Sequence, residues 1–416
     1  MKRIFTYQIL CVAILLTLSS LAGAKNWPCW RGPRGDGSSL EKDVPVRWDA
    51  TTNVVWKTAV PGVGHASPIV WGDRIFTVTA LPETQERRLL CLDRQTGAIL
   101  WQTTVLAASL EKKHNDNSYA SGTPATDGER IYVAFLDGAD AVVAAYDLAG
   151  KPLWQVRPGT FSSPHGFSCS PVLYKDKVII NGASKGDDAF VAALSRTDGH
   201  TLWKVQNENH MLSYSTPLIR QIGGRTQMIL CGNRSVAGYN PDDGSRLWVV
   251  DGPSDEFVAT PVYSERAGLV FISSGYPQRH LLAIRPDGTG NVTQTHVAWR
   301  TTEGAAYVPS LTLLDDYLLT TTTAGQVHCF EAVTGTLLWK ESLGKQYPSP
   351  VVANGLVYIP NDAGVVNVIK PGPTFERLAQ NDLGEKTTAS PALSAGQIFL
   401  RTDAHLFCIG GAPGIR

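Results

Sequence analysis

The chain has 416 residues, of which 43% are apolar and 18% charged, and its 37 basic side chains balance its 37 acidic ones. This composition is typical of a compact folded protein and excludes a largely disordered chain. A neutral chain lacks the surplus of basic residues that binds nucleic acid or anionic membranes, so neither is expected as a partner.

The N-terminus has the parts of a secretory signal. Lys2 and Arg3 precede an apolar run over residues 9–18, and small residues occupy positions 22–24. The run is shorter than the ~20 residues that a membrane-spanning helix needs. We therefore predict a signal peptide at residues 1–24, no membrane span, and a mature protein in the periplasm, the cell envelope or the extracellular space.

A repeated turn is the first sign of internal repeats. The pattern of glycine, three residues and tryptophan occurs at Gly97 and Trp101, Gly150 and Trp154, Gly199 and Trp203, Gly244 and Trp248, and Gly335 and Trp339. Trp299 follows a longer turn, Trp56 precedes the first full unit, and Leu378 stands where the seventh unit should have a tryptophan. Because the spacing is fixed, we interpret the indoles as groups that dock neighbouring units together, and we expect a weaker junction at Leu378.

A second marker opens each unit. A small residue and a proline precede a β-branched stretch at Ser67, Thr123, Ser170, Thr216, Thr260, Ser349 and Ser390, and Pro309-Ser310 is a reversed version. Short alternating runs separated by Gly and Asp turns lie between the two markers, as at 70–80, 88–93 and 98–103. Such runs are typical of strands. Each unit therefore reads as a four-stranded antiparallel meander that has to stack on its neighbours.

These units predict an all-β fold, an eight-bladed β-propeller over residues 53–410. The eighth unit ends before its tryptophan strand, and residues 53–57 supply that strand from the other end of the chain. The N- and C-terminal strands then share one blade and close the ring, which removes exposed sheet edges. Residues 25–52 form an N-terminal lead-in segment, residues 411–416 form a C-terminal tail, and self-closed edges favour a monomer.

Motifs of familiar chemistry are missing from the sequence. Cys91, Cys329 and Cys408 share one repeat position and are interpreted as buried small hydrophobes. A disulfide at Cys29 is left open, and no CxxC pair indicates a redox or zinc site. The Asp-rich turn at 240–244 lacks the full spacing of a calcium loop, so no metal site is expected.

Polar and aromatic residues gather just ahead of the strand-opening markers. In a propeller the first strand of each blade lines the central channel, so these residues are expected to converge at one channel mouth as a ligand funnel. The alternative is that they satisfy loop backbones and channel water. They are His65, Tyr119, His165, His210, Tyr214, Glu256, Glu303, Tyr307, Tyr347 and Lys386.

The units at 90–101 and 329–339 resemble the PQQ-like, tryptophan-docking quinoprotein repeat, and the lead-in at 27–33 resembles that of exported planctomycete-type propellers without an assigned activity. One branch of the family, the quinoprotein alcohol dehydrogenases, implies PQQ with calcium, catalytic Asp and a vicinal disulfide. Another, the BamB-like scaffolds of outer-membrane assembly, implies no cofactor. The chain has no Cys-Cys pair, so no catalytic residue is transferred and no cofactor is expected.

Three hypotheses follow. The first is a non-catalytic scaffold that binds envelope or periplasmic proteins, with the irregular stretch from Leu106 to Ser118 as a candidate contact loop. The second is a propeller that binds a small ligand or carbohydrate at its channel mouth. The third is a PQQ-dependent alcohol or sugar dehydrogenase. We rank them in that order, with an enzyme the least favoured.

Overall fold

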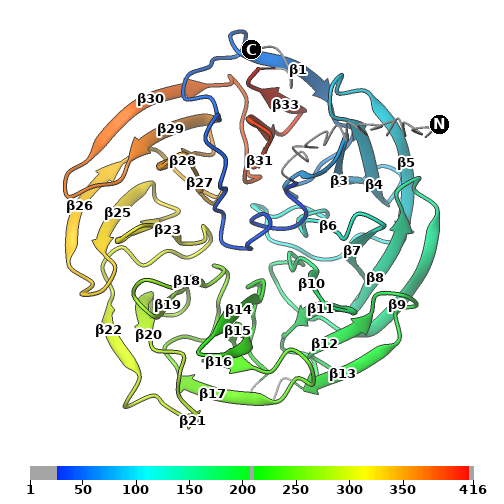
Figure 1. Ribbon diagram of the computed structural model, residues 1–416. Coiled ribbons are helices and arrows are strands. Elements are labelled where there is room, and N and C mark those ends of the chain that lie inside the picture. Colours follow the sequence, from blue (N-terminus) through cyan, green and yellow to red (C-terminus); the bar gives the residue numbers. More distant parts are fainter. Residues whose placement is uncertain (1–25, 207–209, 412–416) are drawn as a thin grey trace, which may run out of the picture.

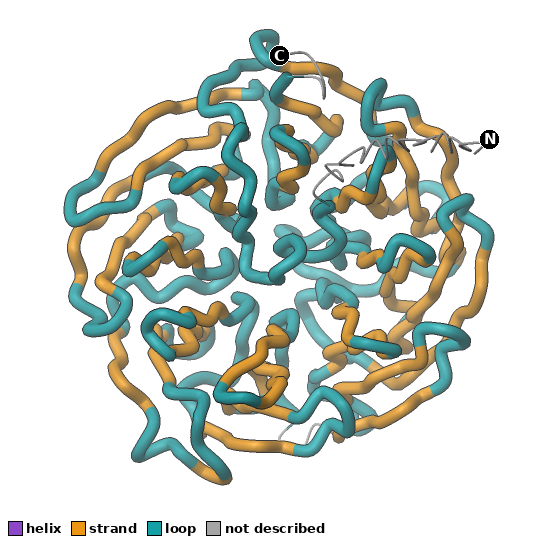
Figure 2. The backbone as a smooth tube through the Cα atoms, in the orientation of Figure 1, coloured by secondary structure: helices purple, strands orange, loops and turns teal. Residues whose placement is uncertain are grey.

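The computed structural model describes residues 26–206 and 210–411, so the predicted signal peptide at 1–24 and residues 412–416 of the tail lie outside the described residues. Eight antiparallel sheets surround one axis as an eight-bladed β-propeller (Figure 1). The described residues form strands, turns and loops, with no helix among them (Figure 2). The predicted fold is confirmed.

Blades are numbered in chain order, and each runs from an inner strand at the axis to an outer strand at the rim. Blades 1 and 2 comprise β2 (Ile69–Trp71), β3 (Arg74–Leu81), β4 (Glu86–Asp93) and β5 (Ile99–Ala107), then β6 (Ala125–Thr126), β7 (Arg130–Asp137), β8 (Asp140–Asp147) and β9 (Pro152–Thr160). Blades 3 and 4 comprise β10 (Val172–Tyr174), β11 (Lys177–Gly182), β12 (Phe190–Ser195) and β13 (Thr201–Gln206), then β14 (Leu218–Ile222), β15 (Arg225–Gly232), β16 (Ser235–Tyr239) and β17 (Arg246–Asp251).

The second half of the ring follows the same plan. Blades 5 and 6 comprise β18 (Val262–Ser264), β19 (Leu269–Ser274), β20 (His280–Ile284) and β22 (Val297–Thr301), then β23 (Thr312–Leu314), β24 (Tyr317–Thr321), β25 (Gln326–Glu331) and β26 (Leu337–Ser342). Blades 7 and 8 comprise β27 (Val351–Ala353), β28 (Leu356–Pro360), β29 (Val365–Lys370) and β30 (Glu376–Asp382), then β31 (Ala392–Ser394), β32 (Gln397–Arg401), β33 (His405–Ile409) and β1 (Val54–Ala59). β21 (Gly290–Asn291) adds to the outer edge of blade 4.

Ring closure follows the sequence prediction. β1 pairs antiparallel with β33, with Trp56 opposite Cys408 and Ala59 opposite His405. The middle strands of the blades are buried on both faces, as in β11 and β19, whereas outer strands such as β13 alternate between exposed and half-buried residues. This pattern arises because each blade packs both faces on its neighbours and exposes only its rim.

Most of the tryptophans dock one blade onto the next. The indole Nε1 of Trp154 donates to the carbonyl of Arg196 at 3.0 Å, and that of Trp299 donates to the carbonyl of Ala332 at 3.0 Å. The turn glycine of the next blade lies against the ring, since a Cβ on Gly199 would come within 2.6 Å of Trp154. Its φ of +77° also requires glycine. Trp56, Trp203 and Trp339 donate to backbone carbonyls in the same way.

Trp248 reaches the next blade through an intermediate. Its Nε1 donates to Oε1 of Gln227 in its own blade at 2.7 Å, and Nε2 of Gln227 donates to the carbonyl of Pro286 in blade 5 at 2.9 Å. The longer turn of blade 5 and β21 cover this indole, which is fully buried. Trp248 therefore contacts blade 5 through Gln227, whereas an indole such as that of Trp154 donates directly to a carbonyl of the next blade.

The lead-in segment crosses the ring as a strap, defined as residues 26–48 (Figure 1). Trp27 exchanges backbone hydrogen bonds with Val70 of blade 1, and Ser38 forms a parallel bridge with Val352 of blade 7. Further hydrogen bonds join the strap to blades 2, 4, 5, 6 and 8. The strap therefore covers one mouth of the central channel.

The same strap fills the junction that lacks a tryptophan. Arg47 donates to the carbonyl of Leu378 at 2.7 Å, and Trp48 stacks on Tyr358 with the ring centroids 6.4 Å apart. The side chain of Asn381 accepts from the Trp48 amide at 3.0 Å and donates to the Val46 carbonyl at 3.0 Å. The strap thus supplies packing between blades 7 and 8 where the other blades use an indole.

The cysteines do not form disulfides among the described residues. Cys91, Cys329 and Cys408 are fully buried, as predicted, and Cys29 is a free thiol that donates to the Gly32 carbonyl. Burial raises the pKa of the Cys29 thiol to about 12. The disulfide that the sequence left open at Cys29 is not formed.

Candidate functional site

The eight opening markers meet at the axis as a ring of hydroxyl groups, here called the hydroxyl ring. Its members, one from each blade, are Ser67, Thr123, Ser170, Thr216, Thr260, Ser310, Ser349 and Ser390. The backbone amide of one member donates to the side-chain oxygen of the next at six junctions, with distances of 2.8–3.1 Å. At these six junctions the small residue before the inner strand therefore joins neighbouring blades at the axis.

A second ring of side chains stands two residues ahead of the first. Because side chains alternate along an extended chain, the residue two positions before each hydroxyl points into the channel as well. All eight such residues line one cavity. They are His65, Ser121, Ser168, Tyr214, Val258, Val308, Tyr347 and Thr388, here called the inward ring.

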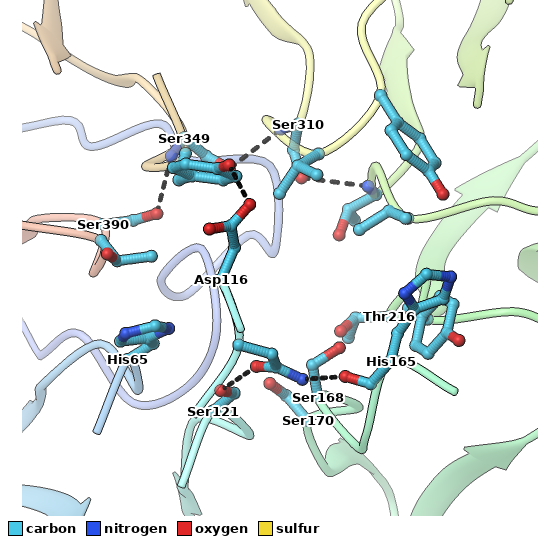
Figure 3. Close-up of a pocket in the computed structure, with 18 of the residues that line it drawn as sticks. His65, Asp116, Ser121, His165, Ser168, Ser170, Thr216, Ser310, Ser349 and Ser390 are labelled. Carbon is cyan, nitrogen blue, oxygen red and sulfur yellow. Dashed lines mark hydrogen bonds between the residues drawn. The ribbon is translucent and has the colours of Figure 1, made fainter. Parts of the chain in front are cut away.

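The cavity, here called the axial pocket, has a volume of about 330 Å³ and lies inside the two rings (Figure 3). Trp30 of the strap also lines it, and the Trp30 Nε1 donates to the Thr260 hydroxyl at 3.0 Å. A smaller cavity of about 200 Å³, between the strap and blades 2 to 4, also borders Trp30. Trp30 and Thr216 line both cavities, and the mouth of the channel that the strap leaves uncovered is the opposite one.

One wall combines aromatic rings with a buried carboxylate. The Tyr307 hydroxyl donates to Glu256 at 2.9 Å, and Nε2 of His165 lies 3.8 Å from the same carboxylate. Tyr214 and Ser163 share a short hydrogen bond between their hydroxyls, and Tyr214 packs edge-on against His165. Burial raises the pKa values of Tyr214 and Tyr307, so both remain protonated donors.

The mouth of the pocket is partly covered by residues 108–118, here called the mouth loop. Asp116 accepts a hydrogen bond of 2.8 Å from the Tyr347 hydroxyl across the channel, and Asn117 donates to the His165 carbonyl at 2.7 Å. A buried ion pair between Arg87 and Glu111 anchors the base of the loop. The bond from Tyr347 lowers the pKa of Asp116. Figure 3 shows Asp116 in the middle of the view, with Ser121 below it and His165 on the right.

His65 is a neutral member of the inward ring. Burial, with the charge of Arg401 behind it, lowers the pKa of His65 from 6.5 to about 4. Arg401 is fully buried and donates to Thr77 and Thr79 of the adjacent blade. The imidazole therefore faces the pocket as a neutral group that can both donate and accept a hydrogen bond.

The structure brings together some of the predicted funnel residues and not others. His65, His165, Tyr214, Tyr307 and Tyr347 line the axial pocket, and Glu256 lies directly behind Tyr307.

The remaining four lie elsewhere. Tyr119 packs against the core between blades 1 and 2, and exposed His210 contacts the Gly186 carbonyl. Glu303 pairs with Lys340 at the surface, and the exposed side chain of Lys386 is outside the pocket lining. These four residues are therefore not among the side chains that line the axial pocket.

Several lining residues were absent from the predicted funnel. Trp30, Asp116 and Asn117 reach the pocket from the strap and the mouth loop, which carry no repeat pattern. Ser168 and Thr388 belong to the inward ring. Both stand two residues before the ring hydroxyl of their blade, and this position in the repeat is a sequence signal that locates them better than residue type does.

The lining does not fit PQQ with calcium. PQQ carries several carboxylates, whereas no lysine or arginine is found among the described residues of the lining, and Asp116 adds a negative charge. Within the described part of the chain, no group of three His, Cys, Asp or Glu side chains is placed to hold a metal ion. Among the described residues, the lining therefore offers PQQ no basic side chain and no preformed cluster of metal ligands.

Comparison with known proteins assigns the repeat to a family. A family model described as outer membrane protein assembly factor BamB matches residues 41–104, 85–307 and 291–372. The chain belongs to this family of PQQ-like β-propellers. The outer membrane protein assembly factor BamB of Yersinia pestis is 22% identical to this family member over 349 residues, which are 83% of this chain and 74% of that protein.

Other PQQ-like propellers are similar over different extents. The quinohemoprotein alcohol dehydrogenase ADH IIB of Pseudomonas putida is 26% identical over 208 residues, 49% of this chain but only 27% of that enzyme's length. The solved structure of BamB from Moraxella catarrhalis has a TM-score of 0.61 at 14% identity and covers 86% of this chain and 99% of that one. A europium-containing methanol dehydrogenase has a TM-score of 0.59 at 12% identity, with coverage of 93% and 98%. The two solved structures share the fold.

No helix long and apolar enough to cross a membrane is found in the described part of this propeller.

Proposed function

We propose that this propeller is a non-catalytic binding protein of the cell envelope and that the axial pocket holds a small polar ligand. The observation that carries the proposal is the geometry of the pocket, which is covered at one end and open at the other. The strap and Trp30 seal one end, and hydroxyl and aromatic side chains line about 330 Å³ beyond it. Cavities of this size with a few placed polar groups are the usual sites of small-molecule binding.

The arrangement of the polar groups supports recognition over chemistry. Asp116 is held by Tyr347, and Glu256 is held by Tyr307, so each carboxylate has a fixed donor. Groups that are fixed by their neighbours present a preorganised surface to a ligand. An envelope location is supported by the BamB relatives, whose name places them in outer-membrane assembly.

A thermal-shift screen of residues 25–416 against sugars, amino acids, amines, organic acids and nucleosides tests the proposal. At least one small molecule should raise the melting temperature, because a ligand that binds only the folded state stabilises it. The double variant His165→Ala, Tyr214→Ala should lose that shift. If no compound stabilises the wild-type protein, the axial pocket is not a ligand site.

A protein-binding scaffold is the second candidate, and the match to BamB proteins over most of both chains favours it. The outer strands also expose apolar side chains just before the docking tryptophans. Leu100 and Leu153, in neighbouring blades 1 and 2, are 50% and 45% exposed. We propose that these leucines, at equivalent positions of neighbouring blades, belong to an apolar surface that a protein partner covers.

The scaffold is tested by capture of solubilised envelope proteins on immobilised propeller. The variant Leu100→Lys, Leu153→Lys should lose its specific partners. The control Val333→Lys, at an equally exposed position on blade 6, should keep them. Identical capture profiles for both variants would reject the outer strands of blades 1 and 2 as the binding surface.

A further inference from the structure

We infer that the axial pocket is built for a neutral carbohydrate of one or two sugar rings; this inference rests on the proposed binding function. The hydroxyl ring is the first reason. Ser170, Ser310, Ser349 and Ser390 line the pocket, and each side-chain oxygen already accepts a backbone amide. A hydroxyl that accepts one bond keeps its own hydrogen and a second lone pair. Such groups match sugar hydroxyls, which also donate and accept.

Within the inward ring, polar and apolar side chains come from different blades. Ser121 and Ser168 come from blades 2 and 3, whereas Val258 and Val308 come from blades 5 and 6 across the axis. A pyranose has the same division, with C–H groups on its faces and hydroxyls at its edge. The two-sided lining therefore suits a sugar better than a uniformly polar or apolar molecule.

Trp30 provides a flat apolar surface on the strap side of this lining. Its indole is fixed by the hydrogen bond of 3.0 Å to Thr260, which leaves the ring faces for contact with C–H groups. A rigid aromatic side chain loses little conformational entropy on binding. Trp30 is thus the platform on which we expect a sugar ring to rest.

The charges near the pocket disfavour charged ligands. No lysine or arginine is found among the described lining residues, so an acidic ligand would meet no basic side chain in the lining itself. The Asp116 carboxylate already accepts a hydrogen bond from the Tyr347 hydroxyl, and its Oδ2 lies 3.7 Å from Nδ1 of His114. Arg279 and Lys345 lie over the rings of Tyr307 and Tyr347, with distances to the centroids of 5.9 and 4.9 Å. These rings are therefore already paired with cations, which disfavours an organic cation as ligand.

The size of the pocket limits the ligand to a short saccharide. About 330 Å³ falls at the small end of the range for ligand pockets, roughly 300–1,000 Å³. The strap closes the channel beyond Trp30, so a long polysaccharide cannot thread through the ring. A monosaccharide, a disaccharide or the end of a longer chain fits this space.

Calorimetric titration of residues 25–416 tests the inference with neutral probes, namely glucose, galactose, mannose, xylose, maltose and cellobiose, and with charged probes, namely glucosamine, galacturonate and choline. We expect saturable heat with at least one neutral probe. Ser168→Ala should weaken that binding by about fivefold to tenfold, the effect of one neutral hydrogen bond. The control Ser342→Ala, on the exposed outer strand of blade 6, should leave it unchanged.

The other outcomes separate the two proposals. Tighter binding of a charged probe, or stabilisation by another class of compound without binding of any neutral sugar, would overturn the carbohydrate inference and leave the pocket as a ligand site. An affinity of Ser168→Ala equal to that of the wild type would show that the sugar does not contact the polar part of the inward ring, and would overturn the carbohydrate inference. If no probe binds and no compound in the thermal-shift screen raises the melting temperature, both proposals are overturned.

Discussion

At glycines in the blade turns, adding a single Cβ atom is predicted to lower the stability of the propeller. A Cβ on Gly150 would lie 2.8 Å from the Trp101 ring, and its φ of +83° is one that side chains rarely adopt. Gly138 has a φ of +62°, and a Cβ added there would meet nothing within 4 Å. The two positions therefore separate backbone strain from loss of indole docking.

We predict that Gly150→Ala destabilises the propeller by about 2–4 kcal/mol, the sum of backbone strain and a clash in a packed junction. Gly138→Ala should cost about 1 kcal/mol, from strain alone. Urea unfolding of both variants measures the difference. Equal losses would mean that the contact between Gly150 and Trp101 contributes nothing to stability.

His65 gives the propeller a predicted dependence on acid. Its pKa is lowered from 6.5 to about 4 in the folded protein, so the unfolded chain binds the proton first as the pH falls. Above pH 6.5, neutral His65 makes its full contribution to the free energy of unfolding. As the pH falls toward 4, this contribution is lost and the free energy of unfolding decreases by at most about 3 kcal/mol.

The prediction is tested by measuring the free energy of unfolding of the wild type and of His65→Gln at about pH 7.5 and about pH 4.5, which together span roughly the titration of His65. The wild-type protein should lose more stability than the variant over that range. Parallel curves would show that His65 has the same pKa in the folded and unfolded chains.

At the scale of elements, the strap takes the place of a missing tryptophan. The two carboxylate oxygens of Glu41 accept from the amides of Ala395 and Gly396 in blade 8 at 2.6 and 2.5 Å. Glu41 is buried, so neither amide has an easy alternative partner in water. Closure of the ring between blades 7 and 8 therefore depends on this part of the strap.

We predict that Glu41→Gln lowers the free energy of unfolding by about 1–3 kcal/mol. The glutamine NH2 group replaces one carboxylate oxygen, so one buried backbone N–H then faces a second donor and loses its acceptor. Glu83→Gln, at an exposed position, is the control and should change it by less than about 0.5 kcal/mol. Chemical denaturation of both variants provides the comparison. A Glu41→Gln protein as stable as the control would contradict the role of the strap in ring closure.

The mouth loop is the second element with a predicted role. The Tyr347 hydroxyl holds Asp116 across the channel, and this single bond joins the tip of the loop to the far side of the ring. Tyr347→Phe removes the bond and keeps the aromatic ring. Hydrogen exchange of amides 113–118 should then be faster, while amides of β28 keep their rates. Unchanged exchange in the loop would mean that other contacts hold it closed.

At the scale of the whole molecule, the repeat explains what the sequence could predict. The turn glycines and docking tryptophans recur at fixed spacing, so the blades, their order and the closure by β1 were all accessible from local patterns. The course of the strap was not, because Trp30 and Thr260 are 230 residues apart and no periodic signal connects them.

The candidate site was accessible only in part for a related reason. Residues chosen by type included His210 and Lys386, which lie outside the pocket, and omitted Ser168, which lines it. Orientation along an extended chain follows position, since side chains alternate, so the residue two places before each hydroxyl was the better guide. The mouth loop has irregular backbone, and its inward turn depends on contacts with distant Tyr347 and His165.

Side-by-side calorimetric titration of the mature protein with the neutral sugars and with PQQ plus calcium decides whether the axial pocket binds a neutral ligand or a quinone. We predict saturable heat for a neutral sugar, loss of that heat in His165→Ala, Tyr214→Ala, and none for PQQ with calcium. Stoichiometric PQQ binding that the same double variant abolishes would show instead that the axial pocket is a quinone site.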